Sequence, residues 1–211
     1  MSRGLPGLSH VDHVGLTVPN LEAAVRFYCD VIGGYELYRI GPFDAAEMPR
    51  MNDGRDWAEA HINVAGARLT IAMLSIGPNL MLELFQYDQP PERQGRPPRN
   101  CDCGGHPIAF KVENLEAAKE YLADRGCKVM DGPIVLDQGP CATTRVNYVL
   151  DPWGNQLELV EYTMQAFEAS APVKIYRPHK YPEGQCGTSP SSVRVKPVFS
   201  RLMASSTPDT A

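Results

Sequence analysis

Met81-Leu82-Glu83-Leu84-Phe85-Gln86-Tyr87 has a close repeat later in the chain, Gln156-Leu157-Glu158-Leu159-Val160-Glu161-Tyr162. Both copies alternate in the way that predicts a half-buried β-strand. On such a strand Glu83, Phe85 and Tyr87 share one face, and Glu158, Val160 and Tyr162 match them in the second copy. A carboxylate among apolar neighbours is costly unless it is paired or binds a metal. Its occurrence in two matched strands therefore predicts a duplicated module with a site between the copies.

The helices that precede these strands repeat as well. Asn20-Leu21-Glu22-Ala23-Ala24 returns as Asn114-Leu115-Glu116-Ala117-Ala118, and each asparagine is a typical helix N-cap. The interval from Glu83 to Glu158 is shorter than the interval from Asn20 to Asn114, so the first copy is the longer one. An irregular stretch at 41–60, broken by proline, glycine and acidic residues, accounts for this difference.

Each copy predicts the order strand, helix and three strands. The first copy opens on an alternating strand at His10–Val18, with further strands expected at about 35–40, 61–64 and 68–74. The second copy opens on a strand from His106 to Val112. The sequence thus predicts an α+β protein of two tandem βαβββ modules at 9–88 and 104–163, a proline-rich charged linker at 89–103, and an extended, partly disordered Pro/Ser-rich tail at 164–211.

The composition excludes several classes of function. The formal net charge is −5 and the sequence contains no basic cluster, which argues against nucleic acid as a partner. No apolar run reaches the length of a membrane helix, and the first residues lack the apolar segment of a secretory signal. Six cysteines in such a chain predict free thiols and a reducing, cytoplasmic compartment.

Four features together resemble the vicinal oxygen chelate superfamily, which includes glyoxalases, epimerases, extradiol dioxygenases and bleomycin-resistance proteins. They are the strand His13–Val18, the paired Asn-Leu-Glu-Ala-Ala helix starts, the turn Asp151-Pro152-Trp153-Gly154, and the two Leu-Glu-Leu strands. The resemblance covers about residues 9–163 and implies that the two modules form a cup-shaped mixed sheet. It is specific for the fold and less so for the reaction, because one fold supports many chemistries.

The resemblance also implies a divalent metal ion inside the cup, held by residues from the first and last strands of each module. Transferred to this sequence, the ligands are His13, Glu83 and Glu158, a mixture that suits Zn, Mn, Fe, Co or Ni. The position that repeats His13 is Pro107, and His106 lies one residue earlier. Either a bulge at Gly104-Gly105 turns His106 inward as a fourth ligand, or the site keeps three protein ligands, or metal binding has been lost. We favour His106 as the fourth ligand.

Other residues are candidates for substrate binding. Phe85 and Tyr87 share the face of the predicted ligands and either line a pocket or only fill the cup. Arg68 and Arg145 begin strands and either hold an oxygen-rich substrate or lie on the surface. The partner is expected to be a small molecule, with no nucleic acid or membrane, and a homodimer is compatible with modules that exchange between subunits.

A metal that chelates neighbouring oxygens polarises a carbonyl, so that a carboxylate can remove the proton from the adjacent carbon. We therefore predict a metal-dependent isomerase, epimerase or lyase with Glu83 and Glu158 as catalytic groups. Two other functions remain open. Pro107, which brings no ligand atom, leaves open a metal-free binding protein of the resistance type. An extradiol-type dioxygenase is disfavoured, because the extra glutamate and the displaced histidine depart from the two histidines and one carboxylate that such enzymes use.

Overall fold

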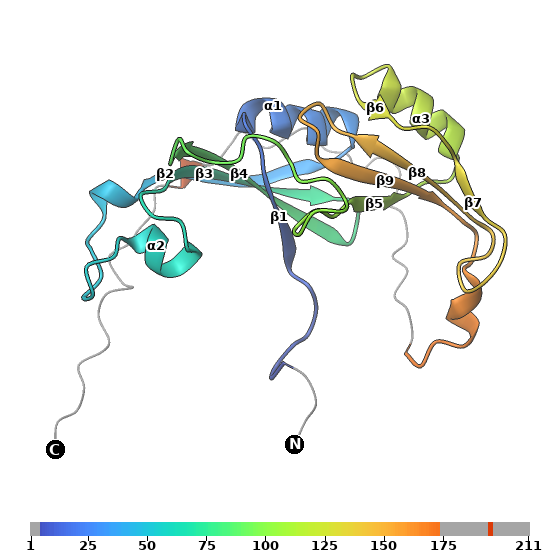
Figure 1. The fold of residues 1–211 in the computed structure, drawn as a ribbon, viewed down its shortest axis with the longest axis horizontal. Coiled ribbons are helices and arrows are strands. Elements are labelled where there is room, and N and C mark those ends of the chain that lie inside the picture. The colour runs from blue at the N-terminus through green and yellow to red at the C-terminus, as the bar shows by residue number, and fades with distance from the viewer. Residues whose placement is uncertain (1–4, 174–193, 196–211) are drawn as a thin grey trace. The chain divides into compact units, whose positions relative to one another are not determined.

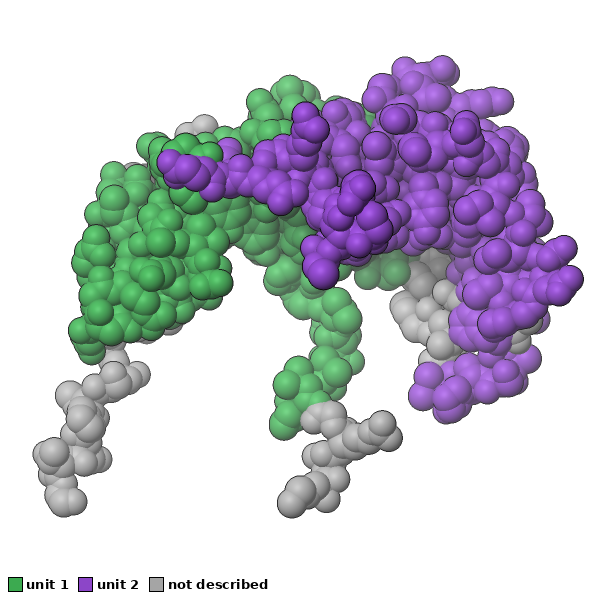
Figure 2. Space-filling view, viewed as in Figure 1, with its two compact units in different colours: residues 1–91, 180–211 green, residues 92–179 purple. Residues whose placement is uncertain are grey.

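The computed structural model describes residues 5–173 and 194–195. The chain forms two compact units, residues 1–91 with 180–211 and residues 92–179 (Figure 2). Most of the predicted tail, residues 174–193 and 196–211, lies outside the described residues. Within its described part, Ala166–Ala169 forms a short 3-10 helix where extended chain was predicted.

The first unit contains one mixed sheet (Figure 1). In chain order its elements are β1 (His13–Thr17), α1 (Leu21–Arg26) with a π-helical turn (Phe27–Val31), β2 (Tyr35–Asp44), a 3-10 turn (Ala45–Glu47), α2 (Trp57–Ile62), β3 (Arg68–Ile76) and β4 (Leu80–Gln89). The strands lie in the order β1-β4-β3-β2-β10, where β10 is Arg194–Val195. β1 runs parallel to β4, and β3 runs antiparallel to both β2 and β4.

Local sequence signals explain how α1 packs on one face of this sheet. The Asn20 side chain accepts a hydrogen bond from the Ala23 backbone N–H, as predicted for an N-cap. The Gln86 side chain of β4 accepts a second bond, from Leu21 N at 2.7 Å. Gln86, Leu82 and Leu84 therefore face α1, and both leucines are fully buried. Glu83 consequently points to the face away from α1.

The segment between β2 and β3 corrects the sequence interpretation. A strand was predicted at 61–64, but residues 57–62 form α2, which Asp56 caps through a bond from Glu59 N and which ends at Asn63 in a left-handed conformation. The alternation at 61–64 is too short to distinguish a strand from the end of a helix. Figure 1 shows α1 and α2 on opposite sides of the first sheet.

The second unit repeats this plan with fewer residues. Its elements are β5 (Ile108–Lys111), α3 (Leu115–Ala123), β6 (Lys128–Val129), β7 (Ile134–Leu136), β8 (Thr144–Leu150) and β9 (Gln156–Glu161). The strand order is β5-β9-β8-β6, with β7 also paired to β8. Asn114 caps α3 as Asn20 caps α1, and Glu161 accepts from Leu115 N at 2.6 Å as Gln86 does from Leu21 N. The predicted α+β class is confirmed, with one mixed sheet in each unit.

Two further expectations can be compared with the described residues. Cys29, Cys101, Cys103, Cys127 and Cys141 are free thiols, as predicted, and the sixth cysteine lies outside the described part. In the part of the chain that the structure describes, none of the helices has both the length and the apolar character needed to cross a bilayer.

Candidate functional site

The face of the first sheet that lies away from α1 carries the predicted residues of β4. Glu83 lies opposite Met73 of β3, and Phe85 lies opposite Ile71. On the other side, β1 places Gly15 beside Glu83. Side chains of directly opposed residues point to the same face, so this face presents His13, Gly15, Met73, Glu83, Phe85 and Tyr87.

One end of this face is covered by the segment that contains α2. A core cluster of Phe43, Ala45, Ala58, Ala67 and Leu69 lies here, and Phe85 and Tyr87 pack against it. The two rings stack with centroids 6.1 Å apart. Burial raises the pKa of Tyr87, and the charge of Glu83 raises it further. The rings thus contribute to the core next to Glu83, and their predicted contact with substrate stays a prediction.

His13 and Glu83 converge at the exposed end of the face. His13 Nε2 lies 3.1 Å from Glu83 Oε2, and His13 Nδ1 lies 2.7 Å from Asp12 Oδ1. Glu83 is 17% exposed, whereas His13 is 39% exposed. The hydrogen bond to Asp12 raises the pKa of His13; burial opposes this rise, and the charges of Glu83 and Asp12 add to it. Asp12 was not predicted to belong to the site. The sequence contained a signal for it, because Asp12 directly precedes His13 and lies outside the strand.

This geometry fits one half of a divalent metal site. The Asp12 carboxylate only accepts hydrogen bonds, so Nδ1 carries the hydrogen and a neutral His13 directs the Nε2 lone pair toward Glu83. Two acceptors 3.1 Å apart require a proton or a cation between them. A histidine oriented by a carboxylate is also the usual arrangement around a metal. Within the described ranges, however, no group of three or more His, Cys, Asp or Glu side chains is arranged to hold a metal.

The second sheet places Glu158 at the position that repeats Glu83. Gly15 pairs with Glu83 in the first unit and Ala109 pairs with Glu158 in the second, so the two sequence repeats also match in the strand register. Pro107 therefore repeats His13 and brings no ligand atom. His106 precedes β5, is exposed, and has Nδ1 2.9 Å from the Gly104 carbonyl oxygen. Its role as a metal ligand stays a prediction.

Glu158 differs from Glu83 in its surroundings. It points away from α3, because Glu161, on the opposite face of β9, bonds the first residue of that helix. Among the described residues, Glu158 has neither a hydrogen-bond partner nor a cationic partner. Burial alone raises its pKa. A half-buried carboxylate without a partner is suited to exchange protons with a bound molecule.

The two predicted arginines have carboxylate neighbours. Arg68 Nε lies 3.9 Å from both Asp44 Oδ2 and Asp88 Oδ2. Arg145 donates to Glu116 at 2.6 Å and to Glu161 at 3.1 Å, and its side chain lies on the face of β8 opposite to that of Glu158. Arg145 therefore joins α3 to β8 and β9, and substrate binding by either arginine stays a prediction.

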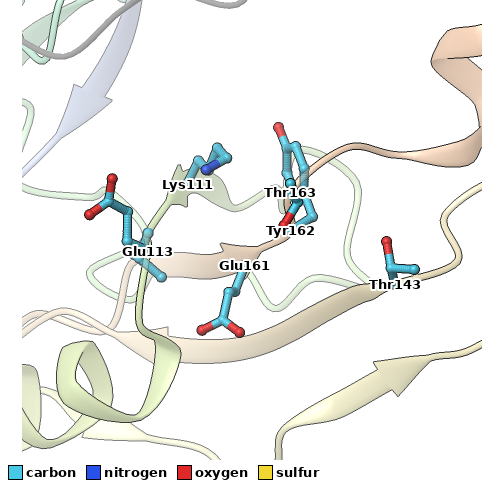
Figure 3. A pocket seen from close by; sticks show the side chains of 7 residues that line it. Lys111, Glu113, Thr143, Glu161, Tyr162 and Thr163 are labelled. Atoms are coloured by element: carbon cyan, nitrogen blue, oxygen red, sulfur yellow. The ribbon is translucent and has the colours of Figure 1, made fainter.

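The second unit has a cavity of about 380 Å³ at the ends of β5 and β9 (Figure 3). Its lining contains none of the predicted metal ligands or arginines, but it includes Tyr162, the repeat counterpart of Tyr87. The lining residues are Lys111, Val112, Glu113, Thr143, Glu161, Tyr162 and Thr163. Lys111 Nζ lies 5.2 Å from the centre of the Tyr162 ring. Because Glu161 already accepts from Leu115 N and Arg145, part of the polar lining stabilises the fold.

Comparison with known proteins gives concordant results. The family model "Glyoxalase/Bleomycin resistance protein/Dioxygenase superfamily" matches residues 10–159. A 2-epi-5-epi-valiolone epimerase from an Actinomyces species is 42% identical over 179 residues, which cover 83% of this chain and 92% of that protein. A glyoxalase family protein from Bacillus cereus has a similar fold, with a TM-score of 0.56 and 20% identity over 75% of this chain and 98% of that one. A domain from a Frankia species gives a TM-score of 0.51, with 20% identity over 74% of this chain and all of that one.

Proposed function

We propose an epimerase function for this chain, which belongs to the glyoxalase/bleomycin resistance protein/dioxygenase superfamily. The observation that carries the proposal is the repeated glutamate, which occupies the same register position in both sheets but has different neighbours in each. Glu83 is paired with His13, whereas Glu158 is half-buried without a partner among the described residues. The similarity to an epimerase supports the same reaction type, and we propose 2-epi-5-epi-valiolone, the ketone in that relative's name, as the first substrate to test.

His13 and Glu83 are the residues that would hold a divalent ion, with Glu158 and His106 as the further ligands that the sequence predicts. Such an ion, when bound, supplies Lewis-acid polarisation of a carbonyl oxygen. Asp12 holds the imidazole with Nε2 directed at Glu83, so that this pair is preorganised. The imidazole of His13 therefore does not have to be oriented when the ion binds, which favours affinity for the ion.

The proton transfers are assigned to the two glutamates. A carboxylate oxygen of one takes the proton from the carbon next to the ketone, and the C–H electron pair moves into the enolate. The other glutamate returns a proton to the opposite face of that carbon, so the configuration inverts and no atom is gained or lost. Burial raises the pKa of Glu158, which favours its protonated form relative to an ordinary glutamate. Glu158 is therefore the better candidate for the proton donor.

Exchange of substrate hydrogen with solvent deuterium tests this reaction. With 2-epi-5-epi-valiolone in D₂O, we expect loss of one proton signal next to the ketone and appearance of the epimer, without oxygen consumption. Replacing either group by Glu83→Gln or Glu158→Gln keeps the size and removes the base, so the rate should fall by about 10²–10⁴. Glu120→Gln, an exposed position on α3, is the matched control and should leave the rate unchanged.

The same experiment separates the competing functions. Oxygen-dependent turnover without exchange at that carbon would indicate a dioxygenase. Tight binding with neither exchange nor epimerisation would indicate a binding protein. Metal removal by a chelator, followed by return of Zn, Mn, Fe, Co or Ni, tests the dependence on a divalent ion. Full activity after complete metal removal would contradict the role proposed for the His13–Glu83 pair.

A further inference from the structure

The residue across the strand from each repeated glutamate differs between the units. Met73 of β3 lies directly opposite Glu83, and Tyr148 of β8 lies directly opposite Glu158. Met73 precedes Glu83 by the same interval as Tyr148 precedes Glu158, so Met73 and Tyr148 occupy equivalent positions. Opposed side chains on antiparallel strands lie about 5 Å apart at Cβ and point to one face. Tyr148 is thus the immediate neighbour of Glu158 on the face away from α3.

The phenol of Tyr148 is half-buried and carries an unused hydrogen-bond donor. The backbone carbonyl of Tyr148 accepts hydrogen bonds from Met130 N and from the Asn147 side chain. Among the described residues, the phenol hydroxyl has no hydrogen-bond partner. A phenol is protonated at neutral pH and so can donate one hydrogen bond. The next residues on this face, Val146 and Val160, oppose each other and are apolar.

Glu158 and Tyr148 are neighbouring polar side chains that bond no other side chain among the described residues, so both are free to bond a ligand. Tyr148 presents a hydrogen-bond donor beside Glu158, and such a donor can bond a hydroxyl oxygen of a molecule bound there. The equivalent position in the first unit carries the Met73 thioether, which donates nothing.

We propose that Tyr148 is a substrate-binding, specificity-determining residue that donates a hydrogen bond to one hydroxyl oxygen of a polyhydroxylated ketone bound at Glu158. This inference rests on the proposed function. At the equivalent position of the first unit, the Met73 thioether cannot donate such a bond. A substrate that lacks this hydroxyl leaves the phenol of Tyr148 unpaired in the complex, and such sites reject deoxy analogues strongly.

The test combines a variant with altered ligands. Binding of 2-epi-5-epi-valiolone and of each of its monodeoxy analogues is measured by calorimetry, with kcat and KM measured in parallel, for the wild type and for Tyr148→Phe. For the parent ketone we expect Tyr148→Phe to weaken binding about 10- to 100-fold. For one deoxy analogue alone, wild type and variant should bind equally, because the partner of the phenol is already missing.

Two further variants control for indirect effects. Tyr148→Met installs the residue of the equivalent position in the first unit and should show the same loss, which excludes an effect peculiar to phenylalanine. Tyr121→Phe alters a tyrosine on α3 that is 39% exposed, and it should bind every ligand as the wild type does. Equal thermal unfolding of all four proteins shows that the fold is kept.

The outcomes distinguish this inference from the proposed function. For each deoxy analogue, the loss of affinity relative to the parent ketone can be compared between the wild type and Tyr148→Phe. If this loss is the same in both proteins for every analogue, the role of Tyr148 is overturned and the epimerase proposal stands. Binding with the expected analogue pattern but without epimerisation supports Tyr148 and overturns the reaction. Failure of the wild type to bind the ketone at all overturns both.

Discussion

Asp12 controls the protonation of His13. A proton and a metal ion would compete for the Nε2 atom of this residue. The Asp12 carboxylate accepts from Nδ1 at 2.7 Å and is the main cause of the raised pKa of His13. A raised pKa means that His13 stays protonated to higher pH than an ordinary histidine. A divalent ion requires the unprotonated Nε2, so proton and metal exclude each other there.

The first prediction is a pH dependence of metal affinity. Affinity for Zn or Mn should fall as the pH drops through the raised pKa of His13. In Asp12→Asn the main cause of the rise is lost, so the fall should move to lower pH. Calorimetric titrations over a pH series measure this. An unchanged midpoint in Asp12→Asn, with His10→Asn as the control for a nearby exposed histidine, would contradict the assignment.

The second prediction concerns Gly15, where the ring of Phe85 lies close to the backbone. A Cβ on Gly15 would lie 3.1 Å from Phe85 Cε2, closer than most such contacts allow. Gly15→Ala should therefore displace the ring and destabilise the fold by about 1 kcal/mol, at the low end for overpacking because the ring is only half-buried. In the second unit the equivalent residues are Ala109 and Val160, so adding Phe85→Val should recover part of the loss. Urea unfolding of the single and double variants checks this, and additive effects would refute the steric explanation.

The sequence predicted some site residues because they repeat, and missed others because register across a sheet is not visible in a single strand. His13, Glu83 and Glu158 follow from alternation, from the repeat and from the family resemblance. Tyr148 required knowledge of which β8 residue lies opposite Glu158. The repeat offered one signal, because the two glutamates align Tyr148 with Met73. Met73 is apolar, however, and gives no indication of a polar site.

At the scale of elements, each unit ties a helix N-terminus to the strand that carries its glutamate. Gln86 accepts from Leu21 N, and Glu161 accepts from Leu115 N. The two bonds are equivalent in position, but only Glu161 is ionisable. Its pKa is lowered by the Leu115 bond first and by Arg145 next, although burial and the charge of Glu116 oppose this.

The third prediction follows from this difference. Gln86→Ala should destabilise the fold by about 1 kcal/mol at neutral pH, because it removes the acceptor of Leu21 N. The lowered pKa of Glu161 means that its contribution is present above the ordinary pKa of a glutamate and is lost as the pH falls through the lowered value. Thermal unfolding from neutral to acid pH should therefore show a smaller acid loss in Glu161→Gln than in the wild type, and Gln86→Glu should gain an acid-sensitive component. Parallel pH curves for all three proteins would contradict it.

Most elements were predictable because their signals are local. The asparagine caps and the alternating strands that carry the two glutamates are confirmed, whereas the source of the first copy's extra length stays a prediction. The interior of that extra length was not predictable: α2 has only six residues, and its packing on Phe43 and Leu69 depends on contacts distant in sequence. The predicted strand at 61–64 was wrong for the same reason.

At the scale of the whole molecule, the division into two units falls between Pro91 and Glu92. Every residue from 91 to 96 is exposed, and β4 ends at Gln89. The fourth prediction is that brief trypsin digestion cuts after Arg93 before it cuts within any strand of either sheet. Mass spectrometry of the fragments identifies the cuts, and Arg93→Gln should delay this step. Earlier cleavage within β3 or β8 would show that the units are not compact.

In each unit an early strand pairs with a strand made much later: β1 with β4, and β5 with β9. On the ribosome, residues 13–17 must therefore wait unpaired until residues 81–85 have been made, whereas in the second unit Ile108 waits only for Leu157. Pairing across longer separations is slower, because more chain entropy is lost before the contact forms. We expect the amino-terminal half to be the slower to mature during synthesis, and its nascent β1 to be the segment most in need of chaperone protection.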